Sequence, residues 1–270
     1  MQTLCQLHAG ETASVGFRYA MSSWSWHLFK ISGIPLSVHY SFLLLLAYIG
    51  YQGWTAQTWA GLIWSVVTVC VFFACVVLHE LGHSFAARRY GVGVRRILLM
   101  PIGGMAEFDS LPREPSKELV ITFAGPAVNF VVAALLWWPM NQLPQHILLY
   151  SAQGLLYQLF WANVVMGVFN LVPVFPMDGG RIFRALLATK FTYLKATQWA
   201  SVVGKVLSVV GASVMYFWLE SWLGALLFAF IFMAGDAEYK AVKRRELEDA
   251  HWREMLVRLH RERQEQPPIL

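Results

Sequence analysis

The chain contains little charge for its length. Of its 270 residues only 14% are charged, whereas 57% are hydrophobic. An ordinary soluble domain is about a quarter charged, so this protein has too few charges to cover a water-soluble globule. We therefore expect an integral membrane protein whose surroundings are a lipid bilayer, and we expect no nucleic acid partner.

Cysteine is also scarce. The chain has three cysteines, too few for a disulfide framework. Cys70 and Cys75 lie in an apolar run, where cysteine usually packs as a small hydrophobic side chain. Cys75 also lies four residues before His79 on the same helical face, so a role as a metal ligand is the alternative to packing.

Long apolar runs supply the membrane-crossing segments. A helix needs about twenty largely apolar residues to cross a bilayer. Segments near this length are 35–51, 61–86, 118–138, 152–172, 197–218 and 222–235. The last segment is short, so five spans are the alternative to six. The sequence predicts an all-α polytopic membrane protein with about six transmembrane helices in a domain of residues 31–236.

The regions on either side of this domain differ from it in composition. Residues 1–30 lack the charged-then-apolar pattern of a cleaved signal sequence, and we treat them as an N-terminal tail that starts at Met1 or Met21. Residues 237–270 are densely charged, with Trp252 and Leu256 among apolar residues at helical spacing. This pattern predicts a cytoplasmic amphipathic helix that is solvated or docks on the protein, the membrane or a partner.

Basic residues predict the orientation of the chain, because Lys and Arg accumulate in cytoplasmic loops. With both termini in the cytoplasm, the three outer loops contain no Lys or Arg. This arrangement fits a multi-pass protein of the cell inner membrane. Lys205 lies inside a predicted span, where its long side chain is expected to reach the cytoplasmic surface.

Residues 95–108 are apolar but do not have the pattern of a helix. Pro101, Gly103 and Gly104 interrupt the segment, which favours short membrane-associated strands or a re-entrant loop. Such backbone is stable at membrane depth only against protein or a wet cavity. A surface hairpin that dips into the headgroups is the alternative.

The second predicted span contains the sequence HELGH. Residues four apart share a helical face, so His79 and His83 can present two imidazoles to one Zn²⁺ ion. Glu80 lies about 100° around the helix, where it is placed to take a proton from the attacking water. Ionisable groups inside an apolar helix are costly unless they pair or bind a metal. The motif therefore predicts one catalytic zinc ion per chain.

A catalytic zinc ion generally takes three protein ligands. Asp178 is the best third candidate, because Pro173 and Pro176 break the helix before it and two glycines after it let the backbone turn. Its predicted depth in the membrane also matches that of the two histidines. The alternative is that Asp178 is the N-cap of a cytoplasmic helix.

Two asparagines are further polar candidates. Asn129 lies in the third predicted span and Asn170 at the end of the fourth. Either amide can donate a hydrogen bond to a developing oxyanion or to a substrate backbone. Hydrogen bonding between helices explains them equally well.

The ordered motifs HELGHSFAARRYGV, PIGGMAEF, AGPAVNF and FNLVPVFPMDGGRIFRALL resemble the site-2 protease family of intramembrane zinc metalloproteases, over residues 30–236. The resemblance implies that His79, His83 and Asp178 bind zinc and that Glu80 is catalytic. It implies that Asn129 and Asn170 lie near the active site. We recognise neither the PDZ domain nor the paired CBS domains that many relatives carry.

The same resemblance implies a substrate that unwinds into an extended strand beside PIGGMAEF. Such substrates are membrane-tethered regulators, for example an anti-sigma factor or a membrane-bound pro-protein. The alternative is a non-catalytic scaffold or substrate-binding pseudoprotease with a structural zinc, which would lack Glu80 or a ligand. A metal transporter is a further alternative, but a transporter would be expected to carry metal-binding residues on several spans along a path rather than one three-ligand site. The sequence leaves the substrate, the oligomeric state and the trigger of cleavage undefined.

Overall fold

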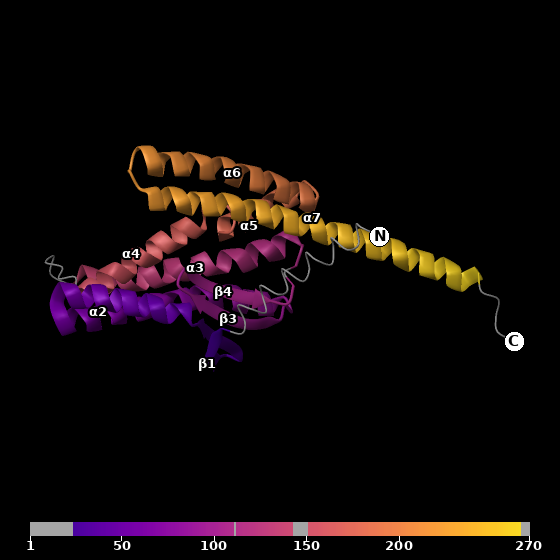
Figure 1. Cartoon of the computed structure of the whole chain (residues 1–270). Coiled ribbons are helices and arrows are strands. Elements are labelled where there is room, and N and C mark those ends of the chain that lie inside the picture. The colour runs from indigo at the N-terminus through magenta and orange to yellow at the C-terminus, as the bar shows by residue number, and fades with distance from the viewer. Residues whose placement is uncertain (1–23, 111, 143–150, 266–270) are drawn as a thin grey trace. The chain divides into compact units, whose positions relative to one another are not determined.

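The computed structural model describes residues 24–110, 112–142 and 151–265, with side chains as far as residue 261 (Figure 1). The chain divides into two compact units. The first unit comprises Met1–Pro112 and Val120–Val168, and the second comprises Arg113–Leu119 and Phe169–Leu270.

Five helices of the described residues are long and apolar enough to cross a membrane. They are α2 (Ser41–Arg89), α3 (Pro115–Asn141), α4 (Ala152–Asn170), α6 (Tyr193–Phe217) and α7 (Trp222–Glu265). Large apolar side chains such as Leu44, Leu135 and Leu226 are exposed along them, as expected for surfaces whose solvent is lipid. The mostly helical, membrane-spanning architecture predicted from the sequence is confirmed.

Helix α2 consists of two helical segments, because Gln57 and Thr58 have non-helical backbone angles. The segments fold back on each other at Gly53 and Gly61, where a methyl group on either glycine would collide with the carbonyl of the other. Small residues permit this close approach of two backbones in an apolar environment. The two segments correspond to the predicted spans 35–51 and 61–86, although the first helix begins only at Ser41.

Four strands form one sheet in the order β1-β2-β3-β4. Strands β1 (Ser25–Ile31) and β2 (Ile34–His39) are antiparallel, β2 and β3 (Val94–Met100) are parallel, and β3 and β4 (Gly103–Phe108) are antiparallel. The extended segment predicted at residues 95–108 is therefore the β3–β4 hairpin. The sheet contains two more strands than predicted, since β1 lies in the expected tail and β2 in the expected first span.

The sheet packs on the second segment of α2. Ile34 and Ile97 of the central strands are almost fully buried and share a core with Phe73, Val77 and Leu81 of the helix. Arg88 at the end of the helix donates to the carbonyl of Ser32 in the β1–β2 turn, at 2.6 Å. The histidine motif and the sheet are thereby held on one helix.

The second unit contains α6 and α7, which lie side by side (Figure 1), and the short helix α5 (Asp178–Ala188). The predicted short span 222–235 and the predicted charged helix after it are one continuous helix, α7. Lys205 of α6 forms an ion pair with Asp236 of α7. Lys205 thus has a partner inside the protein, and its expected reach to the membrane surface stays a prediction.

We expect Gly61→Ala to destabilise the protein, because its methyl group would displace the Gly53 carbonyl. Overpacking of this kind costs about 1–3 kcal/mol. Gly50→Ala is the matched control, since its methyl group would first meet Val66 at 3.4 Å, an ordinary contact. Denaturant unfolding in detergent micelles measures the difference, and equal stability of the two variants would contradict the close packing.

Candidate metal centre

His79 and His83 lie on consecutive turns of the second segment of α2. Their Nε2 atoms face each other at 3.1 Å. Both residues are buried, with 5% and 7% of their surface exposed. The helical spacing that predicts a shared ligand face therefore also brings the two imidazole nitrogens together in the folded protein.

The hydrogen bond of His83 Nδ1 shows which nitrogen of this ring is available for a metal. His83 Nδ1 is 2.8 Å from the carbonyl oxygen of Ile121, which only accepts, so Nδ1 carries the proton and donates it. In the neutral ring Nε2 then carries a lone pair, and it points at His79 Nε2. Ligating histidines are usually oriented by such a bond from their second nitrogen. A cation between the two nitrogens fits this arrangement.

Helix α3 forms a tight wall beside the imidazoles. A methyl group on Gly125 would collide with His83 Nε2 and would lie 2.9 Å from His79 Cε1. Gly82 of α2 packs against the backbone of Ala124 in the same way, since a methyl group there would lie 2.7 Å from the Ala124 carbonyl oxygen. Gly82 and Gly125 thus let α3 lie directly against the helix turn that carries the two imidazoles.

Glu80 is bound to the edge of the sheet. Its Oε2 accepts a hydrogen bond from the backbone N–H of Ala106 in β4, at 3.0 Å. A methyl group on Gly104 would lie 2.9 Å from Glu80 Cγ. In the described sheet β4 is an edge strand paired with β3, so the carboxylate lies along the other, open side of β4. Sequence reasoning missed this contact, although it placed an extended segment here.

Asp178 belongs to the second compact unit, and it is the first residue of α5. Met177 is the N-cap residue, in an extended conformation, so the alternative that Asp178 itself is the cap is wrong. Methyl groups on Gly179 and Gly180 would collide with backbone atoms of residues 171–175. The glycines thus let α5 start directly against the preceding loop. Since His79 and His83 lie in the first unit, the three-ligand set remains a prediction.

The two asparagines have different surroundings. Asn129 of α3 is fully buried, and within the described residues neither of its amide atoms has a hydrogen-bond partner. It packs against α4, where a methyl group on Gly167 would lie 3.4 Å from Asn129 Cβ. Asn170 is the last residue of α4 and is half-buried. Their roles at the site also remain predictions.

Asn163 is a buried polar residue that the sequence analysis missed. It is fully buried in α4, and its Nδ2 donates to the carbonyl of Leu159 at 2.8 Å. Its position in an apolar span was the available signal. Cys75 is buried among apolar residues, and Cys70 is exposed.

Comparisons with known proteins agree on one family. The model of peptidase family M50 matches residues 67–151 and 139–211. A zinc metalloprotease of Methanocaldococcus jannaschii is 43% identical over 188 residues, which are 70% of this chain and 53% of that protein. Stage IV sporulation protein FB of Bacillus subtilis is 28% identical over 125 residues, which are 45% of this chain and 40% of that protein.

A solved structure is also similar to this chain. The site-2 protease from Methanocaldococcus jannaschii superimposes with a TM-score of 0.58 at 36% identity, covering 80% of this chain and 95% of that one. The chain spans about half the length of the curated relatives that it matches.

We expect Gly125→Ala to weaken zinc binding by at least about tenfold, the lower end of the effect of substitutions around metal ligands. The added methyl group would collide with the His83 ring and crowd the His79 ring, so it would displace the two imidazoles. Gly167→Ala is the control, because its methyl group would meet Phe130 at 3.0 Å and no imidazole. Chelator competition measures the affinity, and equal affinities in the two variants would contradict the role of Gly125.

Proposed function

This chain belongs to peptidase family M50, and from that membership we propose that it is an intramembrane zinc metalloprotease. Its reaction is hydrolysis of a peptide bond in or near the transmembrane segment of membrane-tethered regulatory proteins. The observation that carries the proposal is the pair of buried imidazole nitrogens that face each other beside Glu80. This donor set suits zinc, whose ligands in proteins are nitrogen, sulfur and carboxylate oxygen.

His79, His83 and Asp178 hold one zinc ion per chain in this proposal. Three protein ligands leave a fourth position open, as is typical of catalytic rather than structural zinc sites. The hydrogen bond from His83 to Ile121 fixes the ring that binds. Two features support Asp178 as the third ligand. It is the first residue of α5, and the tight packing of the two glycines that follow it fixes the position of its backbone.

The bound metal would act as a Lewis acid that polarises the scissile carbonyl and acidifies water. Glu80 accepts a proton from the attacking water as the water oxygen bonds to the carbonyl carbon. When the carbon–nitrogen bond breaks, Glu80 gives that proton to the leaving amine. Asn129 and Asn170 donate hydrogen bonds to the oxyanion or to the substrate backbone, a role for which the buried amide of Asn129 is suited.

The substrate binds as an extended strand along β4. An edge strand offers a row of unpaired backbone groups, and strand addition is a common mode of peptide recognition. The contact between Glu80 and Ala106 supports this proposal, because it places the carboxylate at the edge where the new strand would lie. A transmembrane helix must unwind before its backbone can pair in this way.

The protein is an integral membrane protein with several membrane-spanning helices, and six crossings with both termini in the cytoplasm form the finer proposal. The two segments of α2 count as two of these crossings. Reporter fusions near Gln57, Gln142 and Glu220 are expected to report the outer side, because no Lys or Arg lies in these loops. A cytoplasmic signal at Gln142 would contradict the orientation.

The central test compares Glu80→Gln with Asp178→Asn in purified protein given a membrane-tethered substrate. We expect Glu80→Gln to keep its zinc and to lose at least about 100-fold in cleavage rate, since general acid–base catalysis contributes about 10²–10⁴-fold. We expect Asp178→Asn to lose both cleavage and zinc, by more than the roughly 10–100-fold effect of substitutions around the ligands.

Zinc content after mild chelator treatment and cleavage rate are the two measurements. Normal cleavage by Glu80→Gln would contradict the proposed mechanism, in which Glu80 transfers the proton. Normal zinc content in Asp178→Asn would assign the third ligand elsewhere, with Cys75, one helical turn from His79, as the first candidate.

A further inference from the structure

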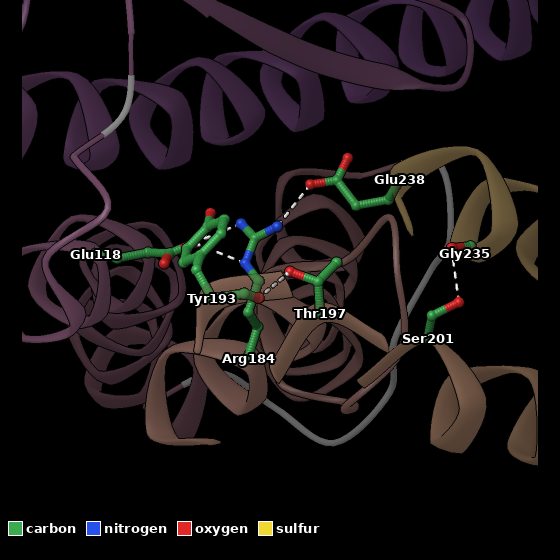
Figure 2. Close-up of polar contacts among 7 residues, drawn as sticks. All are labelled: Glu118, Arg184, Tyr193, Thr197, Ser201, Gly235 and Glu238. Atoms are coloured by element: carbon green, nitrogen blue, oxygen red, sulfur yellow. Dashed lines mark hydrogen bonds and ion pairs between the residues drawn. The ribbon is translucent and has the colours of Figure 1, made fainter. Parts of the chain in front are cut away.

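Arg184 of α5 is buried and held by two carboxylates (Figure 2). Its side chain is 3% exposed. Nε donates to Glu118 Oε1 at 3.0 Å, and Nη2 donates to the same oxygen. Nη1 donates to Glu238 Oε1 at 2.7 Å. Glu118 lies at the start of α3 and Glu238 in α7, so one guanidinium joins α5 and α7 to the first turn of α3, all within the second unit.

Two aromatic rings enclose the same guanidinium. Arg184 Cζ lies 4.9 Å from the centre of the Tyr193 ring and 5.3 Å from that of Phe175, within the range of cation–π attraction. Burial lowers the pKa of Arg184, but its electrostatic interactions with Glu118, Tyr193 and Glu238 more than offset this effect and raise the pKa above its ordinary value. The side chain is therefore a fixed cation.

A gain in stability is a weak explanation for this cluster. Removing two opposite charges from water costs several kcal/mol per ion by rough estimate, and well-packed apolar residues often stabilise a protein as well as a buried ion pair does. A planar guanidinium with several hydrogen bonds does, however, fix geometry closely. The contacts of Arg184 therefore serve mainly to hold its side chain, and the residues packed on it, in one position.

Phe175 connects Arg184 to the start of α5. Phe175 is 1% exposed and lies three residues before Asp178. The intervening turn is closed by a hydrogen bond from Met177 N–H to the Val174 carbonyl at 2.9 Å. A methyl group on Gly180 would lie 2.7 Å from Phe175 N, so helix and loop backbones are in direct contact. Phe175 and the turn that leads to Asp178 are therefore packed directly against the start of α5.

We propose that Arg184 is a positioning residue that fixes the turn from Phe175 to Asp178 and thereby sets the metal affinity of the site. The inference rests on the proposed function, because it requires Asp178 to be a zinc ligand. Glu118 is the main anchor of Arg184, since its side chain is 1% exposed, whereas that of Glu238 is 33% exposed.

The test measures zinc affinity by chelator competition in the full-length protein. We expect Arg184→Gln and Glu118→Gln to weaken zinc binding by about 10–100-fold, the usual effect of substitutions that support metal ligands. Glu238→Gln is expected to have a smaller effect, and Arg184→Lys is expected to retain part of the affinity through its charge.

Asp236→Asn is the matched control. It removes the ion pair with Lys205 between α6 and α7 of the same unit, and it leaves Phe175 and Arg184 intact. We expect this variant to lose stability without losing zinc affinity. Thermal unfolding of the metal-free proteins measures stability separately. The absorption spectrum of bound Co²⁺ is a second measurement, and it should change in Arg184→Gln but not in Asp236→Asn.

A double variant separates this inference from the proposed function. If Asp178 is a ligand and Arg184 acts through it, Arg184→Gln should add little to the loss of zinc affinity in Asp178→Asn. Zinc loss in Asp178→Asn with normal affinity in Arg184→Gln would overturn only the role of Arg184. Normal affinity in Asp178→Asn would overturn the proposed ligand set. If Arg184→Gln fails to fold, Glu118→Gln and Arg184→Lys give the same comparison.

Discussion

A polar group inside an apolar helix has no water to bind, so it must find its partner in the protein or in a metal ion. The second segment of α2 contains three ionisable groups in its HELGH motif, and their contacts join elements of the first unit. His83 binds the backbone of α3, Glu80 binds the backbone of β4, and the two imidazoles face each other. The requirement for satisfied polar groups therefore attaches both a helix and a sheet to the segment that contains the HELGH motif.

Local sequence patterns predicted much of this arrangement. The spacing of His79 and His83 defines one helical face, and apolar length predicts helices at every span of the described chain. Pro101 and the glycines after it correctly indicated extended backbone at residues 95–108, because these residues disfavour a continuous helix. Each of these signals depends on neighbours a few residues apart.

Features that depend on distant residues were missed. Strand β2 resembles the apolar start of a span, and its pairing with β1 on one side and with β3, some sixty residues later, on the other makes it a strand. Arg184 and Glu118 are 66 residues apart, and no periodicity links them. The ion-pair partner of Lys205, Asp236, comes from the next helix, 31 residues later. The third zinc ligand stays a prediction for a similar reason, because Asp178 and the histidines belong to different units.

The hydrogen bond between Glu80 and Ala106 sets up a competition. Backbone groups alternate in direction along an antiparallel strand, so the N–H of Ala106 that Glu80 occupies is one that an incoming strand would also need. An N–H group makes one strong hydrogen bond. A strand that pairs at Ala106 must therefore release the carboxylate. The carboxylate thus caps the open edge of β4 at Ala106, and only a strand with a competing acceptor displaces it.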